Sequence, residues 1–429
     1  MSRNSIPGFI GSIALACGMW FYAHYVLAPI QKSFAVAHRV PRGNLSDLYP
    51  RWLGARELLR NGKDPYSPEM TREIQVGYYG RSLNQDYLYD PRDQAGFAYP
   101  AYVVFLLAPT ILLPFAVVQT GVYWLFIAVM TGTVILWFKA LQWRPQQLTL
   151  LTAIVFGLGC FPAIQALALL QLTILVAGFL ALAFVLTIRR KFVIAGLVLA
   201  LSTIKPQITI PSVVWLGLWA VSDWRERKGL LLGFLGGMAV LFASAQWVLP
   251  GWVTKFYHAV IAYQQYTLGM TSADVLFGPC LGRIVTSLLV IVAVVVSWRS
   301  RSKMESSPEF AFASCFILAT TAAIVPTFAP YNQLLLFPGL LFLIQHRRSL
   351  SPKKRWQKIL LSIAVFAICW QWIAAIVLSV IYCFVSKAFV ERMWEAPFYA
   401  SIPLPMILMC LLYVCAATTR RTRMAQATP

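Results

Sequence analysis

The chain is 429 residues long, and 59% of its residues are hydrophobic while only 12% are charged. A mean hydropathy of +0.68 excludes an ordinary soluble globule. The formal net charge of +21 would suit a nucleic-acid-binding protein, but the basic residues form short clusters between apolar runs. That arrangement is the positive-inside pattern of membrane proteins, so we predict membrane lipids as partners and no nucleic acid.

Apolar runs of about 18 or more residues recur along the whole chain, and each is long enough to cross a bilayer. They predict an all-α polytopic membrane protein with about 10–12 transmembrane helices. We expect a single domain over residues 1–429. The first run, residues 6–30, is longer than the core of a signal peptide, so we expect a retained span although Ala35-Val36-Ala37 resembles a cleavage site.

Residues 31–99 are predicted to form a long first extracytoplasmic loop. Eight of the 15 acidic residues lie in it, between Asp47 and Asp93. One helical stripe in this loop is apolar and consists of Leu48, Trp52, Ala55 and Leu59. The stripe predicts an amphipathic helix in the membrane interface, which ends at Asn61-Gly62.

The basic clusters predict which loops are cytoplasmic, namely 188–191, 223–228, 298–310, 346–358 and 419–429. The turns near 205–207, 250–277, 329–333 and 386–403 would then lie outside. With Met1 in the cytoplasm, residues 31–99 would be outside, and two full crossings between residues 101 and 138 would leave residues 139–147 outside as well. The later basic loops require residues 139–147 to be in the cytoplasm. Because Pro109 and Pro114 interrupt residues 101–118, we expect that run to be re-entrant or half-length.

Asp47 is the first candidate for chemistry. It lies between an apolar span and the predicted interfacial helix, so its carboxylate should stand at the boundary between membrane and water. A carboxylate there can accept a proton from a sugar hydroxyl as general base. The alternative is that Ser46 or Asp47 caps the helix ahead of Pro50.

Lys205 is the second candidate. It is the only charge in the middle of the apolar stretch 192–222, where an ionisable residue is costly and marks a functional site by default. Pro206 breaks the helix beside it, which predicts a hairpin tip where the ammonium could hold a lipid phosphate. The alternative is a lysine that snorkels from a helix end to the headgroups.

A third group combines aromatic rings and amides, which suit sugars, with cations, which suit phosphate. Its members are Lys255, Tyr257, His258, Tyr263, Gln264, Gln265, Tyr266 and Asp274. For any single one of these residues, the favoured interpretation is an ordinary aromatic belt at the membrane surface, which Trp252, Tyr257 and Tyr263 fit. The polar turn 330–333 is of a common kind and predicts little alone. The four His and eight Cys have no metal-ligand or disulfide spacing, so no metal is expected.

Five segments of the chain, taken in order, resemble a known family. They are SDLYPRWLGARELLRNGKDPY, GFAYPAY, LLQLTILVAGFLALAF, AGLVLALSTIKPQ and APYNQLLLFPGLLFLI. The pattern resembles the polyprenyl-phosphate-sugar-dependent glycosyltransferases of the GT-C class, specifically the bacterial, mannosyltransferase-like family 87.

The resemblance implies a GT-C-like helical bundle in the cell membrane with its active site on the outer face. It implies an inverting transfer of a sugar, most often mannose, from a polyprenyl-phosphate donor to a lipid or glycan acceptor, without cofactor or metal. Asp47 would be the general base and Lys205 a contact to the donor phosphate. Further substrate contacts would come from Tyr99, Gln171, Tyr331, Asn332 and Gln333, and charge compensation from Lys255, His258, Arg283 or an arginine of the first loop.

The chain departs from the family pattern at three positions. Leu170 replaces a glycine, Asn332 replaces an aspartate, and Ala101 replaces a second proline. These departures keep open a non-catalytic protein with the same fold. A transporter or flippase is the main alternative, because the pair Lys205-Pro206 also suits a discontinuous transport helix.

Overall fold

The structure is a computed structural model. It describes residues 6–37, 46–84, 86–87, 89–267, 269–326, 328–347 and 355–427, without the side chains of residues 266, 356 and 419–427. The predicted site residue Tyr266 and the predicted cytoplasmic clusters at 348–354 and 419–429 therefore lie outside the described side chains.

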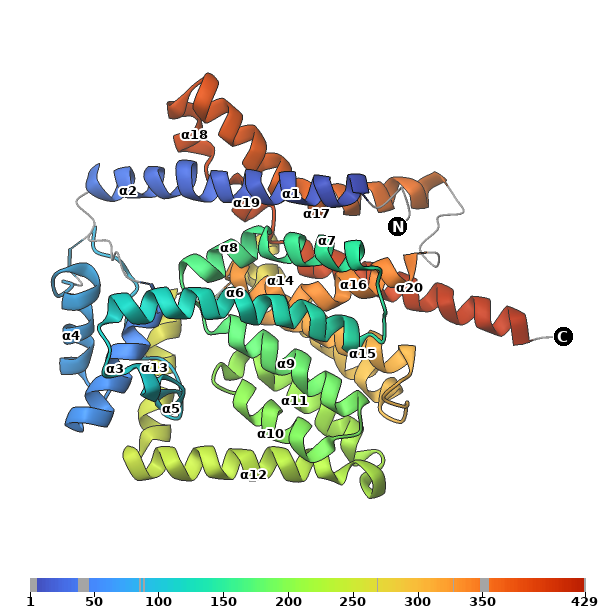
Figure 1. The fold of residues 1–429 in the computed structure, drawn as a ribbon, viewed down its shortest axis with the longest axis horizontal. Coiled ribbons are helices and arrows are strands. Elements are labelled where there is room, and N and C mark those ends of the chain that lie inside the picture. Colours follow the sequence, from blue (N-terminus) through green and yellow to red (C-terminus); the bar gives the residue numbers. More distant parts are fainter. Residues whose placement is uncertain are drawn as a thin grey trace.

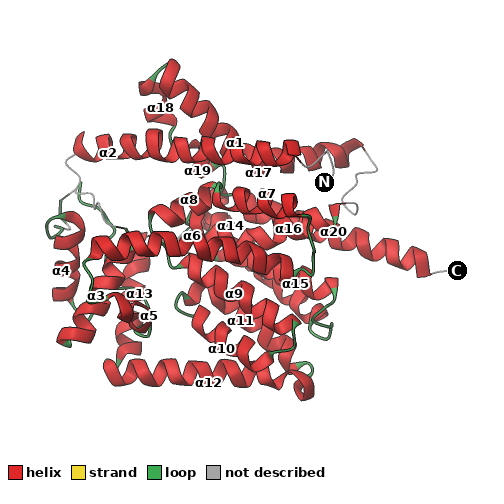
Figure 2. Ribbon diagram, in the orientation of Figure 1, coloured by secondary structure: helices red, strands yellow, loops and turns green. Residues whose placement is uncertain are grey.

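All regular elements of the described residues are helices (Figures 1 and 2). The N-terminal half contains α1 (Ile6–Phe21), the π-helix η1 (Tyr22–Leu27), α2 (Ala28–Ala37), α3 (Leu48–Asn61), α4 (Pro68–Tyr79), α5 (Val103–Leu107), the short 3-10 helix η2 (Ala108–Thr110), α6 (Phe115–Ala140), α7 (Gln147–Leu158), α8 (Phe161–Ala168), α9 (Thr173–Ile188), α10 (Phe192–Ser202) and α11 (Pro206–Val221). The remainder contains α12 (Trp224–Val248), α13 (Trp252–Thr267), α14 (Ser272–Ser300), α15 (Pro308–Ile324), the 3-10 helix η3 (Pro330–Leu336), α16 (Phe337–Gln345), α17 (Arg355–Phe384), α18 (Lys387–Met393), α19 (Ala396–Tyr399) and α20 (Leu404–Ala427).

Within the described residues, six helical stretches are long and apolar enough to cross a membrane. They are Ile6–Ala37, Phe115–Ala140, Trp224–Val248, Ser272–Ser300, Gln357–Phe384 and Lys387–Thr418. The pair α7 and α8, which bends by 56°, would be a seventh, and α9, α10, α11 and α15 are shorter apolar helices. The prediction of an all-α polytopic membrane protein is confirmed, while the count of 10–12 crossings stays a prediction.

The stretch 101–118 is not a full span, as the prolines indicate. It contains only the five-residue α5 and the three-residue η2 before α6 begins after Pro114. The expected incomplete segment is confirmed. It positions the preceding loop, because α3 packs against both α5 and η2.

The apolar stripe of α3 faces protein. Leu48, Trp52 and Ala55 are each at most 2% exposed and belong to the main hydrophobic core. Gly62 ends the helix in the left-handed conformation (φ 66°), as predicted. The stripe is therefore not free to contact lipid, and the position of α3 at the interface stays a prediction.

Helices α9, α10 and α11 run back and forth between two ends of the molecule. Residues 189–191 and 222–223 join them to their neighbours at one end, and residues 203–205 connect α10 to α11 at the other. Helix α10 also packs closely on α12. At Gly196 there is no room for a side chain, since an added Cβ would lie only 2.1 Å from the carbonyl oxygen of Leu230. Small residues allow such close approach of apolar helices.

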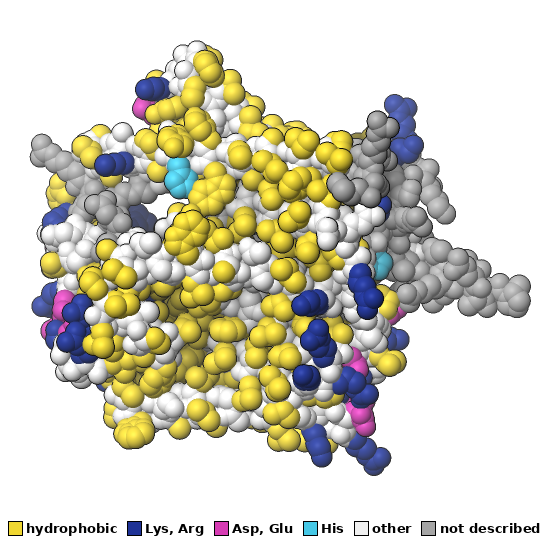
Figure 3. Space-filling model, in the orientation of Figure 1, with side chains coloured by type: hydrophobic (Ala, Val, Ile, Leu, Met, Phe, Trp, Pro, Cys, Tyr) yellow, Lys and Arg dark blue, Asp and Glu magenta, His cyan; other side chains and the backbone are white. Residues whose placement is uncertain are grey.

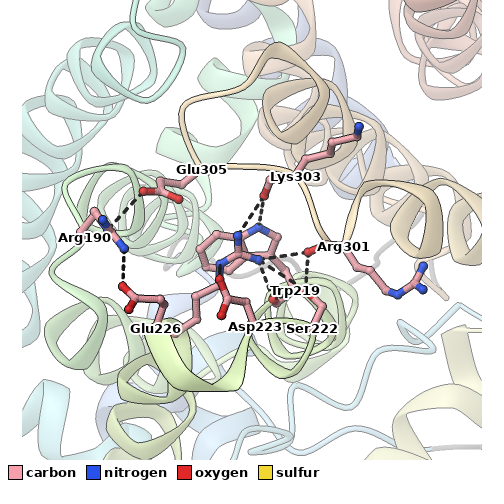
Figure 4. A network of polar contacts seen from close by, with 9 residues as sticks. Arg190, Trp219, Ser222, Asp223, Glu226, Arg301, Lys303 and Glu305 are labelled. Carbon is pink, nitrogen blue, oxygen red and sulfur yellow. Dashed lines mark hydrogen bonds and ion pairs between the residues drawn. The ribbon is translucent and has the colours of Figure 1, made fainter.

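A polar network closes the first of these ends (Figure 4). The buried Arg227 guanidinium lies 4.0 Å from the Trp219 ring and donates to the Trp219, Arg301 and Lys303 carbonyl oxygens at 3.2–3.3 Å. Arg190 pairs with Glu226 at 2.7 Å and with Glu305 at 3.4 Å. The network thus ties together the basic loops that the sequence predicts to be cytoplasmic.

Charged side chains gather at opposite ends of the face shown in Figure 3. One group lies over α3 and α4, and the other lies over the loops that the Arg227 network joins. Hydrophobic side chains cover most of the surface between them. This is the surface expected of a protein whose apolar middle lies in a bilayer.

Candidate active site

A cavity of about 410 Å³ lies at the end of α9–α11 that is opposite the Arg227 network. Side chains far apart in the sequence line it, from the first loop, the α8–α9 turn, the α10–α11 tip, α13 and η3. Its polar members include Asp47, Arg51, Tyr78, Asp93, Gln171, Lys205, Gln207, Tyr263, Gln264 and Asn332. We call it the central cavity.

Asp47 presents its carboxylate to the central cavity. The residue directly precedes α3 but makes no capping hydrogen bond with its side chain, and the Ser46 hydroxyl has no partner among the described residues. Instead, Gln171 Nε2 donates to Asp47 Oδ2, and the Tyr78 hydroxyl donates to Oδ1 at 3.4 Å. The helix-cap interpretation of Asp47 is therefore wrong.

Burial raises the pKa of the Asp47 carboxyl above its ordinary value, although Arg51 and Lys205 oppose this shift. The carboxylate is then a stronger base than one in water, provided that it is ionised. The two hydrogen-bond donors hold it in one orientation. A carboxylate with these properties is suited to take a proton from a hydroxyl placed in the cavity.

Lys205 is held at the tip between α10 and α11. It is only 5% exposed, and its Nζ donates to Thr173 Oγ1 at 2.8 Å and to Asn332 Oδ1 at 3.4 Å. The ring centroid of Tyr331 lies 4.5 Å from Nζ. These contacts turn the ammonium into the protein, so the snorkelling interpretation is wrong.

Arg51 adds a second cation to the central cavity. Its guanidinium lies 4.7 Å from the Tyr99 ring centroid and donates to the Asp47 backbone carbonyl. In the described part of the chain, neither Arg51 nor Lys205 forms an ion pair with a carboxylate. Two cations with neutral partners make this cavity suited to an anionic group.

The backbone conformation of Leu170 places Gln171 where its side chain can reach Asp47. Leu170 has φ +47°, and the Gln171 N–H bonds the Ala166 carbonyl at 2.9 Å, which closes the end of α8. Glycine favours this left-handed conformation, so the leucine keeps the turn at a cost in backbone strain. Its side chain is 2% exposed, and this burial offsets the strain. The departure from glycine thus leaves Gln171 in place.

Four of the residues to which the family resemblance assigns a substrate contact or charge compensation do not line the central cavity. Lys255 pairs with Asp64 at 2.8 Å, and His258 and Arg283 are exposed on α13 and α14. Gln333 donates to the Ser401 carbonyl at 2.6 Å and lines a separate, apolar cavity. The positions of these four residues do not support the predicted contact with substrate, because their side chains are outside the lining of the central cavity.

Two further residues of the site were not singled out by the sequence, namely Tyr78, which lines the central cavity, and Thr173, which accepts a hydrogen bond from Lys205. Thr173 lies in the segment that carries the family resemblance, two residues after Gln171, and that spacing was a usable signal. Tyr78 had none, because it is one of two adjacent tyrosines at the end of a polar helix. Among the described residues, no group of three or more His, Cys, Asp or Glu gathers as metal ligands would.

The helices and the central cavity together define a polytopic membrane protein with a half-buried carboxylate and two cations at one end of its helices. A model of glycosyltransferase family 87 matches residues 97–326, more than half of the chain. The chain belongs to that family, and it is therefore a glycosyltransferase, as predicted. No curated protein and no solved structure matches it.

The matched region contains Tyr99, Gln171 and Lys205, but it begins after Asp47 and ends before Asn332. The roles of all five residues stay predictions. Family membership favours a transferase over the transporter alternative, because the family consists of glycosyltransferases. Such an enzyme has to hold a sugar donor and an acceptor.

Proposed function

We propose that this protein transfers a sugar, mannose by family resemblance, from a polyprenyl-phosphate donor to a hydroxyl of a lipid or glycan acceptor, with inversion. The observation that carries the proposal is that Asp47 and Lys205 line one cavity and that, among the described residues, the side chains of both form hydrogen bonds to neutral groups alone. A base and a cation are what this reaction requires, one at the attacking oxygen and one at the leaving phosphate.

In the proposed reaction, the acceptor oxygen attacks the anomeric carbon while Asp47 takes the proton of the hydroxyl. The bond between the anomeric carbon and the phosphate oxygen breaks, and the polyprenyl phosphate leaves with the electron pair. Gln171 and Tyr78 keep the carboxylate directed at the acceptor. General-base help of this kind contributes on the order of 10²–10⁴-fold to the rate.

The departing phosphate gains negative charge, and we assign its stabilisation to Lys205 and Arg51. Both cations face the cavity, and Thr173 and Asn332 hold the Lys205 ammonium without neutralising it. Asn332 fits this role better than an aspartate, which would compete with the phosphate for Lys205. Preorganised charges in a site with little water stabilise such a leaving group strongly.

A lipid-linked donor also fits the apolar part of the central cavity. Ile210, Val253 and Tyr257 line it and are each more than 40% exposed, on α11 and α13. Such a surface between apolar helices suits a prenyl chain that enters from the membrane. The cavity is at the end opposite the three basic loops that the Arg227 network joins, which supports an active site on the outer side of the cell membrane.

The test compares wild type, Asp47→Asn and Asp93→Asn in membranes supplied with radiolabelled polyprenyl-phosphate-mannose and a native lipid extract. Asp93 also lines the central cavity, so Asp93→Asn is a matched control for loss of a cavity carboxylate. We expect labelled glycolipid or glycan from wild type and from Asp93→Asn, and a loss of at least about 100-fold in Asp47→Asn.

Correct folding of Asp47→Asn can be checked in the same preparations. Since the folded-state pKa of Asp47 is raised, its ionised form opposes folding above the unfolded-state pKa. Asp47→Asn should therefore not lower the melting temperature at neutral pH. Product that persists in Asp47→Asn but is lost in Asp93→Asn would assign the base to Asp93 and reject Asp47.

A further inference from the structure

A second cleft lies beside the central cavity. It has a volume of about 870 Å³ and is formed by α4, residues 83–84, 87 and 90–98, and the second half of α13. Its lining includes the hydrogen-bonding side chains of Thr71, Arg72, Asn84, Arg92, Gln94 and Gln265. We call it the α4 cleft. Neither Asp47 nor Lys205 lines it, so it is outside the site already described.

The α4 cleft and the central cavity share Gly96 and Ala98 as lining residues. There is open space around Gly96 at this boundary. A Cβ added to Gly96 would contact only the Thr71 hydroxyl within 4 Å, at 3.9 Å, apart from the adjacent residues. The two cavities therefore adjoin at Gly96 and Ala98.

The walls of the α4 cleft are held in place before any ligand binds. Gln75, which is 4% exposed, donates to the Gln94 carbonyl and accepts from the Leu83 N–H, each at 3.1 Å. Asp90 pairs with Arg81 and accepts from the Asn84 N–H at 2.7 Å. Such a preformed cleft loses little conformational entropy when a ligand binds.

The chemistry of the α4 cleft suits a saccharide. Arg72 and Arg92 are exposed and form no ion pair in the described part of the chain, whereas Asp90 is already paired. Amide, hydroxyl and guanidinium groups beside Tyr66 and Tyr87 match the hydroxyls and apolar faces of a sugar. The lipid-facing part of the central cavity lies on α11 and the first half of α13, whereas the α4 cleft is lined by residues farther along α13.

From this arrangement we infer that the α4 cleft binds the saccharide part of the acceptor, while the lipid-linked donor occupies the central cavity. The two substrates approach Asp47 from different sides, and the acceptor hydroxyl passes Gly96. The inference rests on the proposed function, since it assigns the second substrate of that reaction. It makes Arg72 and Arg92 determinants of acceptor binding.

The experiment uses the purified protein, radiolabelled polyprenyl-phosphate-mannose and two acceptor preparations from the envelope of the producing cells. One is a fraction of water-soluble oligosaccharides, and the other is a chloroform–methanol glycolipid extract. The variant is Arg72→Gln/Arg92→Gln. The matched control is Arg60→Gln/Arg225→Gln, which removes the same charge from exposed arginines outside both cavities.

We expect the acceptor concentration for half-maximal rate to rise about tenfold or more in the cleft variant, because hydrogen bonds to two charged donors are lost. The half-saturating donor concentration should stay within about twofold. The preparation that yields product tells whether the saccharide is free or lipid-linked. An unchanged acceptor dependence, or an equal change for the donor, would overturn the inference.

Binding without turnover separates this inference from the proposed function. Saturation-transfer NMR of both preparations is recorded with Asp47→Asn, with and without the two cleft substitutions. Binding that requires Arg72 and Arg92, together with no product from wild type, would reject the transfer and support the cleft. Binding that does not depend on them, or no binding of either preparation, would reject the cleft.

Discussion

Replacement of Gln171 by leucine tests how the base is positioned. The substitution keeps the buried volume similar but removes the N–H group that donates to Asp47 Oδ2. A hydrogen bond to a charged group is worth about 1.5–3 kcal/mol. Since about 1.4 kcal/mol is a factor of ten in rate, we expect kcat/KM to fall about 10- to 150-fold.

The same variant has a predicted effect on the pH profile. A donor to the ionised carboxyl lowers its pKa, so loss of Gln171 should raise the already elevated pKa of Asp47 further. The base works only when ionised, and activity is therefore lost as pH falls through that pKa. The acid limb of kcat/KM should move to higher pH in Gln171→Leu.

The assay is transfer from radiolabelled polyprenyl-phosphate-mannose, measured as kcat/KM across the acid range. Gln146→Leu is the control, because it makes the same chemical change at an exposed position outside the central cavity. A Gln171→Leu enzyme within twofold of wild type, or one with an unmoved acid limb, would refute the positioning role. A purely structural role would lower the amount of folded protein without moving the limb.

Two further predictions concern stability. Leu170→Gly removes the strain of a left-handed leucine, about 1–2 kcal/mol, but also removes a buried side chain that contributes about 2–5 kcal/mol to stability. The melting temperature in detergent should therefore fall. A rise would show that the strain is the larger effect. Arg227→Lys keeps the charge but cannot reach the carbonyls of Trp219, Arg301 and Lys303 together, so thermal unfolding should occur at lower temperature. Unaltered unfolding of Arg227→Lys would contradict the assigned role of the network.

Local signals in the sequence were sufficient for much of the fold. Long apolar runs predicted the helices, because a bilayer demands that every backbone group be bonded within its own segment. Gly62 predicted the end of α3, and Pro206 predicted the break between α10 and α11. Pro109 and Pro114 likewise predicted the incomplete segment before α6. Each of these depends on the backbone of one residue and not on distant contacts.

Local signals failed where packing decides what a side chain faces. The apolar stripe of α3 was correctly identified, but apolar surface is buried equally well by lipid and by protein. In the structure, α5 and its neighbours cover it. Lys255, His258 and Arg283 have suitable chemistry for a phosphate, yet the rotation of α13 and α14 directs them away from the central cavity.

The sequence by itself determined that this is a helical membrane protein with Asp47 and Lys205 as its most informative charges, because composition and the cost of intramembrane charge are visible residue by residue. Only the tertiary structure decided their partners. Asp47 meets Gln171 across 124 positions of the chain, and Lys205 meets Asn332 across 127. Contacts at such separations arise from how the helices pack, which no local pattern encodes.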